Sequence, residues 1–234
     1  MTNDLLYLID VVKDSSKLIT SDFIVKDKGN KGDLVTDLDL KVENYIIRKL
    51  KEKYPNFDIV SEEYNSDKGL TENCFVIDPI DGTINFASNI PIWAIQVAMI
   101  KNDDVVAAVI YSPKLDELYC ADKSGAYLNN KKIHVNDMDI YNGLYVVDGT
   151  NKFDMQQKLV KENPHIRVYY SAALEYAWVA CGRLSGMAFL KDTLWDYVPG
   201  EYIVKQAGGV IYNEENLHVA ANNKDFIKIF KNNK

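Results

Sequence analysis

The amino-acid sequence predicts a protein of mixed α/β (α+β) class, with helices and strands packed in layers. Two observations lead to this prediction: residues 92–135 are rich in strand patterns, and the second half of the chain alternates short strands with helices. Two amphipathic segments precede the strand-rich block. Elements of both kinds in one chain favour layered packing over an all-helical or all-strand fold.

The first third of the chain contains two predicted helices. In the first, apolar residues recur at helical spacing after a polar cap at residues 2–3, and the helix should fade around residues 21–23. The second follows Asp39 and ends before Pro55, because proline restricts the residue that precedes it. Between the two helices, residues 26–33 are charged and contain glycine, which predicts a solvated loop.

Apolar runs bounded by turn residues predict the strands of the centre. They cover residues 57–60, 74–77, 92–99, 105–111 and 117–121. Residues 126–135 resemble a hairpin that turns at Asn129 and Asn130, and we expect antiparallel pairing in this block. The strand 74–77 should stop at Asp78, because Pro79 has no amide hydrogen with which to continue a ladder.

The second half alternates strands and helices. Strands are predicted at 144–147, 167–170, 187–190 and 210–212, the last of the chain, and helices at 154–162, 172–180 and 197–206. Pro199 should lie in the first turn of the last helix. Because no linker or internal repeat interrupts the sequence, we expect one domain over residues 1–234. It would have an N-terminal α+β half to about residue 140 and a C-terminal α/β half from about 141.

Charge and cysteine content exclude several classes of function. A formal net charge of −7 argues against a nucleic-acid groove and against binding to an anionic membrane surface. It does not argue against a phosphorylated substrate, because bound cations reverse the charge of a local site. Cys74, Cys120 and Cys181 lie far apart in apolar settings, which predicts buried thiols. Without a signal peptide or membrane span in the sequence, we expect a cytoplasmic protein.

The end of the strand at 74–77 carries the first chemical signal. Asp78 and Asp81 lie three residues apart, with the carbonyl of Ile80 between them, and hard divalent cations prefer such oxygen ligands. The amides of Gly82 and Thr83 follow, and amides in a turn can hold a phosphate. This pattern favours a metal-dependent phosphatase. Turn capping explains two aspartates equally well when they are considered alone.

Other acidic residues have equally ordinary explanations when taken singly. Glu62 and Glu63 follow the strand 57–60 and can be a solvated pair. Asp39 and Asp196 each stand near the start of a predicted helix, where capping is common.

Taken together, the motifs resemble a known family. Residues 78–86, Asp-Pro-Ile-Asp-Gly-Thr-Ile-Asn-Phe, are similar to the first signature of inositol monophosphatase-like enzymes, and residues 194–200, Leu-Trp-Asp-Tyr-Val-Pro-Gly, are similar to the second. Segments 33–39 and 61–63 stand where that family has its upstream acidic motifs, and segments 171–173 and 181–183 match further family segments. The resemblance covers nearly the whole chain.

The resemblance implies the layered αβαβα sandwich of inositol monophosphatases and fructose-1,6-bisphosphatases, a homodimer, and two or three Mg²⁺ ions. Glu62, Asp78 and the Ile80 carbonyl would hold one ion, and Asp78, Asp81 and Asp196 a second, with a third and weaker ion near Glu62. Two cations can clamp the attacking and leaving oxygens of an in-line displacement.

The same resemblance assigns the remaining roles. Thr83 would orient the attacking water, with Asp39 as its partner and Glu62 as the proton acceptor. The amides of Gly82 and Thr83 would stabilise charge on the phosphate. The expected phosphate and substrate contacts are Lys28, Asp81, Gly82, Thr83, Ala172 and Asp196.

Two positions depart from the family pattern. Phe189 stands where inositol-type members have a glutamate, seven residues before Asp196, and Val198-Pro199 replaces small residues. The expected substrate is inositol monophosphate or a similar sugar or polyol phosphate. An aromatic side chain can also pack on a ring, so a nucleotide phosphatase acting on NADP or 3′-phosphoadenosine 5′-phosphate is the alternative. A non-catalytic regulatory protein with the same fold is a second one.

Overall fold

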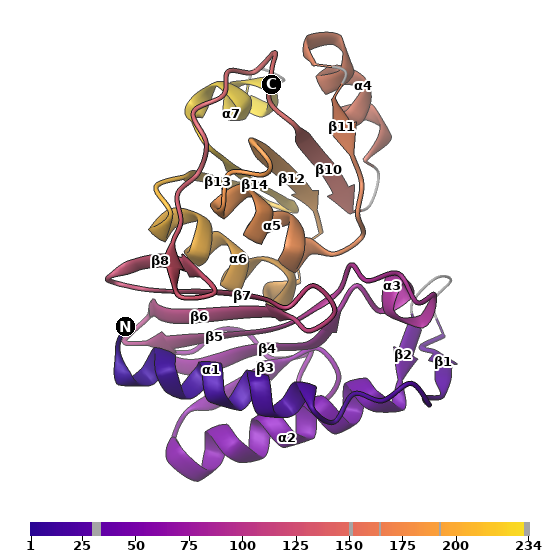
Figure 1. The fold of residues 1–234 in the computed structure, drawn as a ribbon, viewed down its shortest axis with the longest axis vertical. Helices are drawn as coiled ribbons and strands as arrows, with labels where there is room; N and C mark the ends of the chain where they lie inside the picture. Colours follow the sequence, from indigo (N-terminus) through magenta and orange to yellow (C-terminus); the bar gives the residue numbers. More distant parts are fainter. Residues whose placement is uncertain (30–33, 150–151, 164, 192, 232–234) are drawn as a thin grey trace.

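The computed structural model describes residues 1–29, 34–149, 152–163, 165–191 and 193–231. The polypeptide forms five alternating layers of helices and sheets, which confirms the expected αβαβα sandwich (Figure 1). Residues 30–33 of the predicted loop, including the first residue of the acidic segment 33–39, lie outside the described residues. No helix in the described part of the chain is both long and apolar enough to cross a bilayer.

Seven strands form the larger sheet, in the order β3-β4-β5-β6-β7-β8-β9. Their bounds are β3 (Asp58–Ser61), β4 (Asn73–Asp81), β5 (Ala94–Lys101), β6 (Asp104–Ser112), β7 (Glu117–Asp122), β8 (Gly125–Leu128) and β9 (Lys131–Lys132). Strands β3 and β4 are parallel, and the other neighbours are antiparallel, as expected for the central block.

The second sheet has five strands in the order β11-β10-β12-β14-β13. They are β11 (Ile166–Arg167), β10 (Tyr145–Gly149), β12 (Gly186–Leu190), β14 (Leu217–Ala221) and β13 (Val210–Glu214). Strands β11, β10 and β12 are parallel, whereas β14 is antiparallel to both of its neighbours. A small antiparallel pair, β1 (Val25–Asp27) and β2 (Leu34–Thr36), lies beside the larger sheet.

Helices cover each face of the two sheets (Figure 1). Helices α1 (Asn3–Ser16) and α2 (Asp37–Lys53) cover the outer face of the larger sheet, and α5 (Ala172–Ala180) and α6 (Leu194–Gln206) lie between the sheets. Helices α4 (Phe153–Glu162) and α7 (Lys224–Lys231) pack on the outer face of the smaller sheet, and the short α3 (Thr83–Ala87) follows β4.

Alternating side chains of β4 connect two of the hydrophobic cores. Cys74 and Val76 pack with the residues of α5 and α6, whereas Phe75 and Ile77 pack with those of α1 and α2. Successive residues of a strand point to opposite faces, and all four side chains are fully buried. Strand β4 is therefore covered on both sides, which holds its C-terminal end in a fixed position.

Strand β4 continues to Asp81, so the prediction that it stops before Pro79 was wrong. Asp78 pairs with Gln96 of β5 and Asp81 with Ala94, so three steps along β4 match two along β5. This β-bulge adds an unpaired residue and tolerates a proline. In a regular strand, residues three apart face opposite sides. The bulge therefore allows Asp78 and Asp81 to face the same helical layer.

Three other boundaries differ from the sequence prediction. Helix α1 ends at Ser16 rather than at residues 21–23. Residues 25–27 of the predicted loop form β1, and the strand predicted at 167–170 shortens to β11, because Tyr170 adopts a positive φ of 56° that a strand does not contain.

The C-terminal prediction was also incomplete. Helix α6 begins at Leu194, three residues early, so Pro199 lies inside the helix rather than in its first turn. Strand β13 is not the last element, because β14 and α7 follow it. Both were missed because they are short. Helix α7 is held through Phe226 and Ile227, which are buried against the smaller sheet.

Close packing between α5 and α6 makes a testable prediction. A Cβ atom on Gly200 of α6 would lie 2.4 Å from Cγ of Tyr176 on α5. We expect Gly200→Ala to lower the free energy of unfolding by about 1–3 kcal/mol, because overpacking forces the helices apart. Gly69→Ala is the matched control, since nothing lies within 4 Å of its added Cβ. Equal urea midpoints for the two variants would contradict this packing.

Candidate active site

Three buried carboxylates converge at the C-terminal end of β4. Oxygen atoms of Asp78, Asp81 and Asp196 all lie within 4.8 Å of one another. Asp78 and Asp81 come from the bulged end of β4, and Asp196 comes from the first turn of α6, about 115 residues later in the sequence. The fold thus brings Asp196 together with two predicted ligands from β4.

The start of α5 fixes the orientation of Asp81. Its Oδ2 atom accepts a hydrogen bond from the hydroxyl of Ser171 and another from the amide of Ala173, at 3.1 Å. Asp78 accepts from the amide of Ile80 at 3.1 Å and from the side-chain amide of Gln96 at 3.4 Å. Neither aspartate is paired with a cation in the part of the chain that the structure describes.

Two lysines form ion pairs with acidic residues in or near this group of carboxylates. Lys28 Nζ lies 2.9 Å from Glu62 and 2.6 Å from Glu63. Lys191 Nζ lies 3.0 Å from Asp196 Oδ2, which also accepts a hydrogen bond from the hydroxyl of Thr193. Lys28 thus reaches the site through Glu62. Lys191 was not predicted from the sequence.

Asp39 and Thr83 are held by neighbours close in sequence. The Thr83 hydroxyl donates to the carbonyl of Ile80 at 3.0 Å, and Oδ2 of Asp39 accepts from the amide and hydroxyl of Thr36 in a capping box. Oδ1 of Asp39 is buried without a partner. No hydrogen bond joins Thr83 to Asp39 within the described residues, so their predicted partnership is not formed in this structure.

Burial raises the pKa of the acidic side chains. It raises the pKa of Asp39 to about 6, and burial with the nearby charges of Asp196 and Glu63 raises that of Glu62 to about 7. The pKa of Asp81 rises to about 8, through burial and then Asp196. That of Asp78 also lies well above its usual range, through burial and then the charge of Glu62. A divalent cation would offset the repulsion that these shifts report.

The turn after Asp81 requires glycine. Gly82 has a φ of +85°, and a Cβ there would lie 3.0 Å from the carbonyl oxygen of Ile92 and 3.2 Å from that of Tyr170. Helix α3 begins directly after it, at Thr83, without a side-chain cap. The amides at the start of α3 therefore stand next to the carboxylates, without a side chain between them.

A pocket of about 340 Å³ contains most of the predicted site. The predicted residues that line it are Glu62, Asp78, Ile80, Asp81, Gly82, Thr83, Ala172 and Asp196. Asp39 and Lys28 are not among its lining residues. Phe189, the departure from the family pattern, lines the pocket as well.

Sequence reasoning missed three lining residues, Asp148, Tyr170 and Lys191. Asp148 could have been found, because it follows a predicted strand of an alternating α/β half, and ligands bind at the carboxyl ends of such strands. Lys191 stands just beyond the carboxyl end of β12, where the same rule applies. No sequence signal indicated Tyr170.

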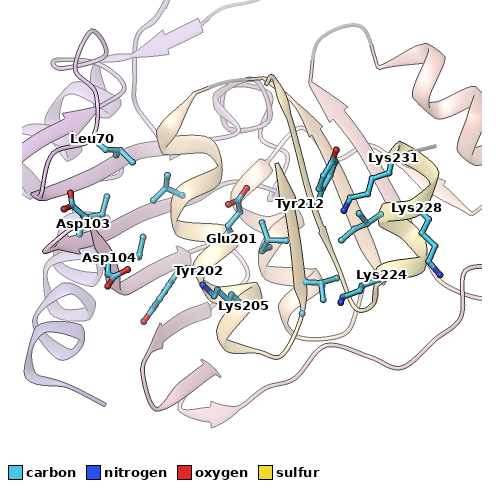
Figure 2. A pocket seen from close by; sticks show the side chains of 17 residues that line it. Leu70, Asp103, Asp104, Glu201, Tyr202, Lys205, Tyr212, Lys224, Lys228 and Lys231 are labelled. Carbon is cyan, nitrogen blue, oxygen red and sulfur yellow. The ribbon is translucent and has the colours of Figure 1, made fainter. Parts of the chain in front are cut away.

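A larger cavity lies elsewhere. It measures about 820 Å³ and is lined by α6, β13, α7 and the turn between β5 and β6 (Figure 2). Three of its lysines, Lys224, Lys228 and Lys231, come from α7, whereas Asp103 and Asp104 lie on the opposite side (Figure 2). None of the predicted catalytic or metal-binding residues lines it. The chemistry is therefore assigned to the smaller pocket.

Comparisons with known proteins show similarity to one family. Residues 6–226 match the model of the inositol monophosphatase family. The chain is 34% identical to an inositol monophosphatase of Dictyostelium discoideum, over 87% of this chain and 82% of the relative. It is also 34% identical to a fructose-1,6-bisphosphatase/inositol-1-monophosphatase of Thermotoga maritima, over 83% and 77% of the two chains. A relative from Escherichia coli K12, 31% identical over 82% and 76%, is named Nus factor SuhB.

Solved structures of related proteins are also similar to this chain. An inositol monophosphatase of Thermotoga maritima aligns with a TM-score of 0.89 at 26% identity, over 98% of this chain and 96% of that chain. The extragenic suppressor protein SuhB of Bartonella henselae aligns with a TM-score of 0.88 at 27% identity, over 98% of both. This chain therefore belongs to the inositol monophosphatase family and is a phosphoric monoester hydrolase.

Proposed function

We propose that the protein is a Mg²⁺-dependent phosphomonoesterase that hydrolyses a small phosphorylated metabolite by direct attack of water. The observation that carries this proposal is the convergence of Asp78, Asp81 and Asp196 in one pocket. Asp78 and Asp81 are buried without a cationic partner among the described residues, which is costly, and an all-oxygen donor set suits Mg²⁺. The residues present therefore fit this metal.

The ligand assignment is the one that the family resemblance implies, and the convergence of Asp78, Asp81 and Asp196 supports its second ion. Glu62, Asp78 and the carbonyl of Ile80 would hold one Mg²⁺, and Asp78, Asp81 and Asp196 a second. Bound Mg²⁺ supplies charge neutralisation and a water of lowered pKa. Glu62 must give up its contact with Lys28 when it acts as a ligand, and Lys28 can then approach the phosphate.

The remaining residues orient water and phosphate. Thr83 lies at the pocket wall with its hydroxyl beside the Ile80 carbonyl, where its oxygen can accept a hydrogen bond from the attacking water. Asp39 has a free buried oxygen to support this network, and Glu62 is the proposed proton acceptor. The amides of Gly82 and Thr83, with Ala172 across the pocket, would bind phosphate oxygens.

This proposal has two forms, which differ in the class of substrate. Inositol monophosphate or a similar sugar or polyol phosphate fits the names of two relatives, the fructose-1,6-bisphosphatase/inositol-1-monophosphatase and the inositol monophosphatase. Phe189 in the pocket favours the second form, in which a nucleotide such as NADP places its ring on the aromatic side chain. A purely regulatory role, suggested by the relative named Nus factor SuhB, would not require the acidic residues to converge.

Asp81→Asn tests the proposed metal site. We expect at least a hundredfold loss of phosphate release, because an amide is a poor Mg²⁺ ligand. The fold should persist, since the change removes a buried charge and adds almost no volume. The measurement is phosphate release from a panel of phosphorylated metabolites with Mg²⁺, together with circular dichroism. Asp104→Asn, at the exposed first residue of β6, is the matched control. Full activity of Asp81→Asn would refute the assignment.

The raised pKa values predict how pH affects stabilisation by Mg²⁺. Without metal, the raised pKa values of Glu62 (about 7) and Asp81 (about 8) favour the folded state at low pH. That contribution is lost as pH rises from about 4, the unfolded value, through about 8. Mg²⁺ binds the ionised form, so the increase in Tm produced by Mg²⁺ over EDTA should grow between pH 6 and pH 8.

Thermal unfolding with Mg²⁺ and with EDTA at several pH values measures this effect. In Asp81→Asn the increase should be smaller and should depend less on pH. A Tm difference that stays constant from pH 6 to pH 8 would show that these carboxylates do not bind the metal.

A further inference from the structure

The pocket has a second wall, which is formed by the smaller sheet. Asp148 of β10 and Phe189 of β12 are direct neighbours across two parallel strands, and both line the pocket. Ligands of α/β sheets bind at this carboxyl edge of the strands. This wall does not include the proposed metal ligands, so it faces whatever part of the substrate lies beyond the scissile phosphate.

The carboxylate of Asp148 already accepts hydrogen bonds from within the protein. Its Oδ1 atom accepts from Lys152 Nζ at 2.7 Å and from the amide of Gly149 at 2.7 Å. Lys152 in turn lies 4.1 Å from the centre of the Tyr170 ring. These contacts hold Asp148 and Tyr170 in one cluster, and they neutralise the carboxylate that a polyol hydroxyl would otherwise use as an acceptor.

Lys191 is the one cationic side chain among the described residues that line the pocket. It follows the last residue of β12 directly and lines the same pocket as Phe189. Its ammonium group lies 3.0 Å from Asp196, and its side chain remains 47% exposed. When Asp196 binds a metal, Lys191 keeps its charge at the pocket wall and can turn to another anion.

We propose that Lys191 is a specificity residue that binds a second anionic group of the substrate, while Phe189 packs on the carbon skeleton or ring that carries it. The inference rests on the proposed phosphatase function and narrows its substrate class. The second group is a phosphate or a carboxylate, since an ammonium binds both as a point charge. A wall with an aromatic face and a lysine favours such a substrate over an uncharged polyol.

Two matched substrate pairs test this inference. Fructose 1,6-bisphosphate is compared with fructose 1-phosphate, and adenosine 2′,5′-bisphosphate with adenosine 2′-phosphate; within each pair only the second phosphate differs. The two pairs separate a sugar skeleton from a nucleoside ring. We expect kcat/KM of the wild-type protein to favour the bisphosphate of at least one pair by about tenfold, the range of a charge-assisted hydrogen bond at a half-exposed site.

The variants assign that preference to a residue. Lys191→Met should lower the ratio of kcat/KM between bisphosphate and monophosphate about tenfold, mainly through KM, and Lys191→Arg should restore most of it. Lys205→Met is the matched control, because Lys205 lines the remote cavity of Figure 2 and should leave the ratio unchanged. Phe189→Glu should move preference towards inositol 1-phosphate, since it introduces a free acceptor for hydroxyl groups.

The outcomes separate this inference from the proposed function. Mg²⁺-dependent release of phosphate with equal kcat/KM within both pairs would overturn the role of Lys191 and leave the phosphatase proposal standing. An unchanged ratio in Lys191→Met would do the same. Failure to release phosphate from any of these substrates or from p-nitrophenyl phosphate would overturn both.

Discussion

Repulsion among carboxylates is the constraint on which the rest of this structure depends. Oxygen atoms of Asp78, Asp81 and Asp196 lie within 4.8 Å of one another. At an effective dielectric constant of about 20, each ionised pair at that separation costs about 3 kcal/mol. Three such pairs approach the whole free energy of unfolding of a typical domain, roughly 5–15 kcal/mol. The fold therefore has to hold these groups together against a force that would separate them.

Packing at a distance from the site supplies that restraint. Strand β4 is buried on both faces, and the bulge at Pro79 points Asp78 and Asp81 to the same side. Helices α5 and α6 pack closely through Gly200 and Tyr176, and they bring the start of each helix to the end of β4. Hydrogen bonds then stabilise the charged form of Asp81, and its raised pKa reduces the fraction of this carboxyl group that is charged.

Much of this could be predicted from the sequence, because the motifs are local. The pair Asp78 and Asp81, the helix that carries Asp196 and most strands of the larger sheet follow from residue patterns. The bulge could not be predicted, since it depends on the register against β5, which no local pattern specifies. Nor could the contact of Asp39 with Thr36, because a capping box and a catalytic partnership require the same residue type. Lys191 was missed because a single lysine in a loop has no periodic signal.

The two walls of the pocket follow different physical rules. The wall at β4 concentrates acidic side chains and is suited to cations and phosphate, so few substitutions there preserve binding. The wall at β10 and β12 does not have to bind cations, so its side chains can vary more. There, Phe189 is anchored in the core that α5 and α6 share with the larger sheet, and Lys191 lines the pocket from the loop that follows β12. A change of these two side chains can therefore alter which leaving group is accepted without disturbing the hydrolytic chemistry.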